Sequence, residues 1–154
     1  MHRYTATTSW SREGAPFTDL RYSRAHRWRF DGGLDLPASS SPQHVRVPMS
    51  NPAGVDPEEA FVASLSSCHM LSFLYVAAKR GIVVDEYVDE AEGVMDRNDE
   101  GRLAITRVVL RPRVTYASTP DAATEAALHH QAHEDCYIAN SVRTEVVVEP
   151  VAVT

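Results

Sequence analysis

The sequence predicts an α+β fold in which antiparallel strands accompany two main helices, in the order β-β-β-α-β-β-α-β. Three observations lead to this class: short alternating segments before residue 50, a capped apolar segment near residues 57–80, and an alternating hairpin followed by a second capped segment. A chain of 154 residues suits one domain, because domains commonly hold roughly 100–200 residues. We therefore expect a single domain spanning residues 1–154.

The first third of the chain predicts a meander of short strands. Apolar and polar residues alternate over residues 4–10, and further strand-like residues fall at 28–30 and 45–47. Turn-forming residues at 31–33 and 39–42 separate these segments.

The next segment carries both signals of a helix. Asp56 can cap its start, Pro57 suits the first helical position, and Glu59 completes a capping box. Arg80 and Gly81 are typical of a helix end. We expect a helix from about Pro57 to Arg80.

This helix is almost free of charge over residues 61–78. A helix that is apolar around most of its circumference must be covered on more than one side, and a small monomer offers little to cover it. The pattern therefore predicts a central helix in a fold that a partner chain completes.

The second half predicts a hairpin, a helix and a last strand. Residues 82–95 and 103–116 alternate on either side of a polar turn. Pro120 and Asp121 begin a helix that extends to about Cys136, and residues 142–148 form a closing strand.

Composition limits the partners and the location that we expect. The net charge of −6 comes from intermixed acidic and basic residues, so we expect no nucleic-acid partner. No apolar run reaches the roughly 20 residues of a membrane span, and the N-terminus lacks a secretory signal. A cytoplasmic protein without a membrane partner is the expectation.

The two cysteines are candidates for redox chemistry, because disulfides in a reducing compartment tend to be transient or catalytic. Cys68 lies in mid-helix, so a reactive thiolate there requires a nearby cation such as arginine. Cys136 lies where the second helix gives way to a loop, which suits a resolving cysteine. The alternative is that both are small buried apolar residues.

A metal site is a competing interpretation. His129, His133 and Cys136 fall at i, i+4 and i+7, so they can share one helix face. No fourth ligand or CxxC pair accompanies them, and we predict neither a metal nor another cofactor.

Two segments resemble the organic hydroperoxide resistance and osmotically inducible protein C (OsmC/Ohr) family of thiol peroxidases. Within residues 51–73, Val55-Asp56-Pro57-Glu58-Glu59-Ala60-Phe61 and Ser66-Ser67-Cys68-His69-Met70-Leu71 are similar to the family's helix start and peroxidatic cysteine. Ala132-His133-Glu134-Asp135-Cys136-Tyr137-Ile138-Ala139-Asn140 is similar to the region of its resolving cysteine.

The resemblance implies an OsmC-like fold and roles for three residues. Glu58 matches the active-site carboxylate, Cys68 the peroxidatic cysteine and Cys136 the resolving cysteine. It also implies an intertwined homodimer with active sites at the interface. Ten residues of helix place the Cα atoms of Glu58 and Cys68 about 15 Å apart, which favours Glu58 serving a Cys68 of the other subunit.

The chain departs from the family pattern in two places. Tyr137 follows the second cysteine, where members often have proline. The catalytic arginine has three candidates, Arg12, Arg24 and Arg46. We favour Arg24, which precedes a strand and lies beside the ionisable His26.

The resulting prediction is a peroxidase that reduces organic hydroperoxides through a Cys68 sulfenic acid and a Cys68–Cys136 disulfide, which an external dithiol of unknown identity regenerates. Apolar residues of the first helix could select bulky peroxides or could form the core: Phe61, Met70, Phe73 and Leu74. The alternatives are a non-enzymatic dimer of the stress response that binds a ligand or metal, and a structural stress protein with buried cysteines.

Overall fold

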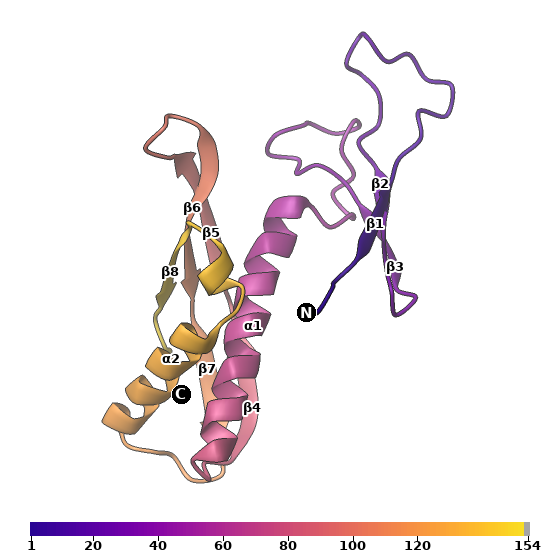
Figure 1. Ribbon diagram of the computed structural model, residues 1–154. Helices are drawn as coiled ribbons and strands as arrows, with labels where there is room; N and C mark the ends of the chain where they lie inside the picture. The colour runs from indigo at the N-terminus through magenta and orange to yellow at the C-terminus, as the bar shows by residue number, and fades with distance from the viewer. Residues whose placement is uncertain (153–154) are drawn as a thin grey trace. The chain divides into compact units, whose positions relative to one another are not determined.

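The computed structural model describes residues 1–152. The chain divides into two compact units, Met1–Ala60 and Phe61–Thr154, each of which is described by itself below. In chain order the elements are β1 (Ala6–Ser9), β2 (His26–Phe30), β3 (Asp35–Ala38), α1 (Pro57–Lys79), β4 (Val84–Asp89), β5 (Glu92–Arg97), β6 (Leu103–Leu110), β7 (Pro112–Tyr116), α2 (Ala122–Asp135), the 3-10 helix η1 (Ala139–Ser141) and β8 (Glu145–Val148) (Figure 1).

The N-terminal unit is built on an antiparallel meander in the order β1-β2-β3 (Figure 1). All four residues of β1 are exposed. The buried residues of the unit lie instead where Ala38 and Ser39, at the end of β3, meet Val55: Ala38 bridges to Val55, and the Ser39 amide donates to its carbonyl oxygen at 3.0 Å. The small buried part of this unit therefore adjoins the start of α1.

The third strand of the meander is not where the sequence predicts it, and the predicted strand at residues 45–47 is wrong. These residues belong to turns, because the amides of His44 and Val45 both donate to the Ser41 carbonyl oxygen. The actual third strand, β3, contains Pro37, which cannot donate to a strand ladder. Because β3 lies at the edge of the meander, the proline is tolerated there.

Helix α1 begins and ends as the sequence predicts. The Glu59 amide donates to the Asp56 carboxylate at 2.8 Å, and the Glu59 carboxylate accepts from the Asp56 amide at 3.2 Å. Gly81 has φ 71°, the left-handed conformation that glycine adopts freely after a helix. The helix therefore continues without interruption from Pro57 to Lys79.

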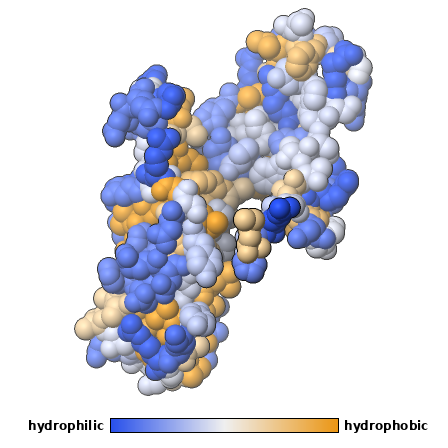
Figure 2. Space-filling view, in the orientation of Figure 1, coloured by the Kyte–Doolittle hydropathy of each residue, from blue (hydrophilic) through white to orange (hydrophobic). Residues whose placement is uncertain are grey.

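By length and composition, α1 could cross a membrane, so the length of the apolar runs does not by itself exclude a membrane-spanning helix. The core helix of a soluble protein has the same properties. In this fold Leu65 and Phe73 of α1 are fully buried against strands of the C-terminal unit and α2. Other apolar side chains remain at the surface of this unit, where orange and blue residues intermingle in Figure 2.

The predicted hairpin forms, but each of its arms is divided into two strands. β5 pairs with β6 near the turn and β4 pairs with β7 beyond it. The division on one arm falls at Arg111, whose amide donates to the Asp89 carboxylate at 2.6 Å instead of joining a ladder. Pro112 follows and has no amide hydrogen to donate.

The closing strand β8 pairs with β6 in parallel, whereas the other pairs among the described strands are antiparallel. Helix α2 lies between β7 and β8 in the chain, and a helical crossover is the usual connection that gives parallel strands. The α+β class with two main helices is confirmed. Its core has two apolar clusters, one joining α1 to α2, β4 and β7, the other joining α1 to β6 and β8.

Candidate active site

The two cysteine side chains of the C-terminal unit come together, although 67 residues of sequence separate them. Cys68 is half-buried on α1, and Cys136 is buried at the C-cap of α2. Both are free thiols, and Cys68 lies close enough to Cys136 to help raise the pKa of its thiol. A bond between them would join α1 to the end of α2.

Burial raises the pKa of the Cys136 thiol to about 11. The Ala139 amide, which donates to Cys136 Sγ at 3.5 Å, opposes this change, whereas the neighbouring Cys68 adds to it. At neutral pH Cys136 is therefore a protonated thiol. Since a negative charge on Cys68 disfavours a second one on Cys136, the pair holds one thiolate more readily than two.

Glu58, in the first turn of α1, has one carboxylate oxygen without a protein partner. Its Oε1 lies 4.0 Å from His44 Nε2. Its Oε2 is buried and has no hydrogen-bond partner among the described residues. A buried carboxylate oxygen without a donor is costly, so Glu58 is suited to bind a guanidinium or another donor.

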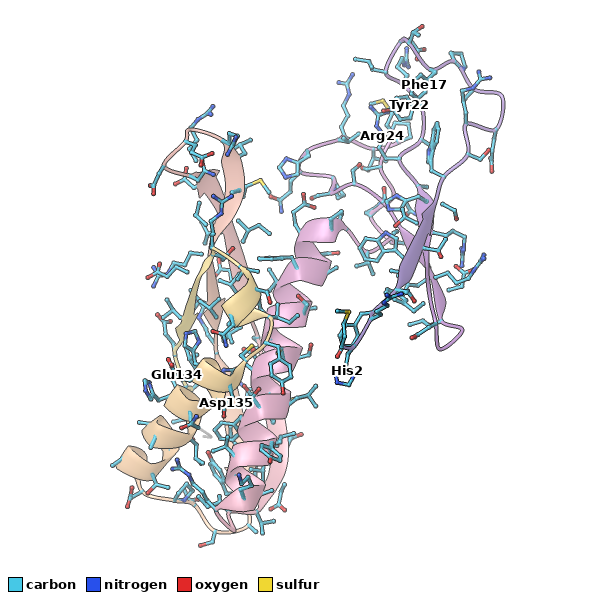
Figure 3. The ribbon with its side chains drawn as sticks, viewed as in Figure 1. His2, Phe17, Tyr22, Arg24, Glu134 and Asp135 are labelled. Carbon is cyan, nitrogen blue, oxygen red and sulfur yellow. The ribbon has the colours of Figure 1, made fainter. Side chains whose placement is uncertain are left out.

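Of the three candidate arginines, Arg24 alone is half-buried, since Arg12 and Arg46 are exposed. Arg24 Nη1 donates to the Leu20 carbonyl oxygen at 2.8 Å and also to that of Tyr22, and the guanidinium lies 3.7 Å from the centre of the Tyr22 ring. These contacts fix one edge and one face of the guanidinium (Figure 3).

An aromatic cluster supports this arrangement. Tyr22 stacks on Phe17 at 4.6 Å and meets Trp10 edge-on at 5.5 Å. Trp10 Nε1 donates to the Ser23 carbonyl oxygen at 2.8 Å. Trp10 and Phe17 are nevertheless 42% and 47% exposed, so the cluster presents apolar rings to its surroundings.

The metal interpretation finds no ligand set in the described part of the chain, where no group of three or more His, Cys, Asp or Glu could hold an ion. A cavity of about 590 Å³ lies elsewhere in the C-terminal unit, lined by β7, the α2 residue Glu125 and residues 150–152. Neither cysteine lines it, so we do not place the chemistry there.

The four predicted site residues thus fall in two groups. The thiols meet within the C-terminal unit, and Glu58 and Arg24 belong to the N-terminal unit, where Glu58 approaches His44 and Arg24 is held by its own loop. Of the apolar residues that could select a peroxide, Phe73 is fully buried core, and Phe61 and Leu74 pack against the core clusters.

Comparison with protein families gives a match to the model described as OsmC-like protein over residues 50–151. This range includes the start of α1 and both cysteines. The chain belongs to the OsmC-like protein family. No curated protein matches it.

Solved structures share the fold of this OsmC-like chain over nearly its whole length. An OsmC-like protein of unknown function from Vibrio cholerae is 51% identical, with a TM-score of 0.96, and the match covers 98% of this chain and 100% of that one. An organic hydroperoxide resistance protein from Elizabethkingia anophelis, with thiocyanate bound, is 18% identical, with a TM-score of 0.72 and coverage of 99% and 96%. The organic hydroperoxide resistance protein OhrB of Bacillus subtilis is 19% identical, with a TM-score of 0.66 and coverage of 99% and 98%.

Sequence reasoning missed several contacts between polar groups of this OsmC-like chain. His44 approaches Glu58 from a turn, and Tyr22 stacks on Arg24 from two residues away. His69 and His129 meet across α1 and α2. The sequence gives one signal for the contact of His69 with His129, namely that each histidine lies on a helix that ends at or contains a cysteine. This signal does not say how close the two histidines are.

Proposed function

We propose that this chain is a cysteine-dependent peroxidase that reduces organic hydroperoxides to alcohols. The observation that carries the proposal is the meeting of the two free thiols, Cys68 half-buried and accessible, Cys136 buried beside it. Membership of the OsmC-like family supports it. Two structural matches are named organic hydroperoxide resistance proteins, and at their low identity they support the fold.

In the proposed reaction, the Cys68 thiolate attacks the terminal oxygen of ROOH. The O–O bond breaks, the alkoxide takes a proton to leave as ROH, and Cys68 becomes a sulfenic acid. Cys136 then attacks the Cys68 sulfur, forming the disulfide and releasing water. An external dithiol reduces that disulfide and becomes oxidised itself, which returns both thiols.

The nearness of Cys68 to the buried Cys136 gives the two steps an order. While Cys68 is a thiolate, its charge helps to keep the Cys136 pKa high, so Cys136 stays protonated and unreactive. Oxidation of Cys68 to the neutral sulfenic acid removes that charge. Cys136 then ionises more easily at the step that requires it.

Arg24 and Glu58 are the proposed partners of the peroxidatic thiolate. The guanidinium would stabilise the Cys68 thiolate and polarise the peroxide, and the unpartnered Glu58 Oε2 would hold the guanidinium by a charge-assisted hydrogen bond. Because Nη1 of Arg24 is engaged by carbonyl oxygens, its other nitrogens are the ones left for these roles.

We propose a homodimer as the working form, with both units belonging to one OsmC-like domain. Leu71 and Tyr75, one turn apart on α1, are 63% and 64% exposed, and β1 is exposed throughout. A second copy of the chain would cover such surfaces, as the apolar α1 requires. A cytoplasmic location, where dithiol reductants are available, fits this chemistry.

Mass spectrometry of the protein after one equivalent of cumene hydroperoxide tests the proposal. We expect a Cys68–Cys136 disulfide in the wild type. Cys68→Ser should consume no peroxide, and Cys136→Ser should consume one equivalent and stop. Thiols that stay reduced in excess peroxide would overturn the proposal and favour a binding protein.

A further inference from the structure

Two buried histidines form the only hydrogen bond between side chains of α1 and α2 among the described residues. His69 Nε2 and His129 Nδ1 are 3.1 Å apart, and the two exposed fractions are 1% and 4%. The rings are nearly parallel, with centroids 5.4 Å apart, and the Phe73 ring stacks on His129 with centroids 4.4 Å apart. This histidine pair, His69 and His129, is therefore held on several sides by packing.

The surroundings of the pair offer no partner for a positive charge. His69 Nδ1, His129 Nε2 and the Nδ1 of neighbouring His133 are buried without a hydrogen-bond partner in the described chain. Tyr87 of β4, which packs on Phe73, has a buried hydroxyl that is also unpartnered.

The partly buried carboxylates of β4 and α2 are occupied elsewhere. Asp89 of β4 accepts from the Ser66 hydroxyl and the Arg111 amide, and Glu125 of α2 accepts from the Tyr116 hydroxyl. Glu134 and Asp135, at the end of α2, are exposed (Figure 3).

The pKa of both rings is lowered to about 4, by burial in each case and for His69 also by the charges of His129 and His133. At neutral pH both rings are neutral, and one ring nitrogen donates to the other. A first proton would place an unpaired charge in this packed layer. A second would leave both facing nitrogens as donors and abolish the hydrogen bond.

The position of the pair links it to the thiols. On α1, His69 is the residue after Cys68, and on α2, His129 precedes Cys136 by seven residues, which is two turns of the same helix face. The histidine pair therefore joins the same two helices that bring the thiols near each other. Fixing this pair restricts where the end of α2 can place Cys136.

We infer that His69 and His129 are positioning residues that hold Cys136 against Cys68, and that acid slows disulfide formation by charging this pair. The inference takes the sulfenic acid of Cys68 from the proposed function. The contact between His69 and His129 does not depend on that proposal. The affected step is the attack of Cys136 on the Cys68 sulfenic acid, which forms the S–S bond and releases water. The attack of Cys68 on the peroxide is not affected.

The test uses variants that separate hydrogen bonding from charge. Glutamine reproduces a hydrogen-bonding group near Nε2 and asparagine one near Nδ1. The double variant His69→Gln, His129→Asn, called the amide pair below, therefore keeps the contact and removes the two titrating rings. His129→Leu removes the contact. His130→Leu is the matched control, because His130 is the exposed neighbour of His129 on the same helix.

Rates are measured in single turnovers with cumene hydroperoxide, quenched and analysed by mass spectrometry for sulfenic acid and disulfide. At pH 7, His129→Leu should slow the conversion of sulfenic acid to disulfide at least tenfold while sulfenic acid forms at the wild-type rate. The amide pair and His130→Leu should convert at the wild-type rate. A folded His129→Leu protein, checked by circular dichroism, with wild-type conversion would overturn the inference.

The pH profile, compared only where circular dichroism shows both proteins to be folded, separates positioning from a merely structural role. The ratio of wild-type to amide-pair conversion cancels the titration of the thiols. It should be one at pH 7 and fall about fourfold by pH 4, where each ring with a pKa of about 4 is half charged. A ratio that stays at one to pH 4 would overturn the inference. If the amide pair does not fold, His69→Gln alone serves in the same ratio, with an expected fall of about twofold.

A second oxidant distinguishes this inference from the proposed function. Diamide oxidises a thiol pair to a disulfide without peroxide and is itself reduced to the hydrazine. If peroxide leaves Cys68 unchanged, the peroxidase proposal fails, and the diamide reaction still measures the positioning of Cys136. Equal diamide rates for wild type and His129→Leu would then refute the histidine pair's role.

Discussion

Arg24 in the N-terminal unit and Cys136 in the C-terminal unit are held in place by different means. The Arg24 guanidinium is held by contacts within five residues of chain, two carbonyl oxygens and one ring face, while the Arg24 backbone amide donates to the Met49 carbonyl oxygen at 2.7 Å. Cys136 is 1% exposed and owes its position to a helix end packed on another helix and a sheet. The side-chain contacts of the first are local and half-buried, and the position of the second depends on the whole unit.

This difference predicts how each unit responds to substitution. Changes at Arg24 or its stacking partner remove few buried contacts, so they should alter reactivity while leaving the free energy of unfolding almost unchanged. Changes in the layer between α1 and α2 should alter stability and thiol chemistry together. The following experiments test that division, in order of decreasing effect.

Phe73→Ala should have the largest effect on stability. Phe73 of α1 is fully buried against α2 and β4. Truncation of such a side chain lowers the free energy of unfolding by about 3–5 kcal/mol. Urea unfolding followed by circular dichroism measures it. Lys79→Ala, at an exposed position of the same helix, is the control, and an equal loss there would mean that α1 is not buried as described.

Arg24→Met should lower kcat/KM for cumene hydroperoxide by about 10²–10³-fold, as removal of one preorganised donor from an active site commonly does. Its urea midpoint should stay at the wild-type value. Arg12→Met and Arg46→Met, at exposed positions, are controls. If either control loses activity and Arg24→Met keeps it, the catalytic arginine has been assigned to the wrong residue.

Acid should destabilise the wild type more than the amide pair His69→Gln, His129→Asn. The folded pKa of each ring is lowered from about 6.5 to about 4, so the unfolded chain binds more protons between these values. Stability is therefore full above about pH 6.5 and is lost as the pH falls, by about 2 kcal/mol per ring at pH 5. Parallel urea curves at pH 7 and pH 5 measure the difference, and identical pH slopes for the two proteins would contradict it.

Tyr22→Leu should have the smallest effect, a loss of about 2–30-fold in kcat/KM, since a cation–π contact contributes about 0.5–2 kcal/mol. Tyr22→Phe keeps the ring and should retain activity. Steady-state rates with cumene hydroperoxide compare them. Equal activity in all three proteins would show that the stack does not help to place Arg24.

The parts of the fold that depend on local chemistry could be predicted from the sequence. Asp56 and Glu59 form the capping box, Gly81 ends α1, and Asp121 caps α2 by accepting from the Thr124 amide. Each signal acts within a few residues of the chain, so composition and spacing are sufficient to find it.

The failures share a dependence on tertiary context. Pro37 argues against a strand until its place at the edge of the meander is known. The division of the hairpin at Arg111 depends on Asp89, 22 residues earlier. At the site, both cysteines and Glu58 could be proposed from motifs, whereas the contact of His69 with His129 depends on how two helices pack.

Asp89 also provides a way to observe how α1 docks on the strands. One carboxylate oxygen takes the Arg111 amide and the other the hydroxyl of Ser66, two residues before Cys68. Deuterium from the solvent should therefore replace the Arg111 amide hydrogen slowly while the helix is docked, and quickly once it lifts from the strands. One resonance in an NMR spectrum would then report the docking of the helix that carries the reactive sulfur.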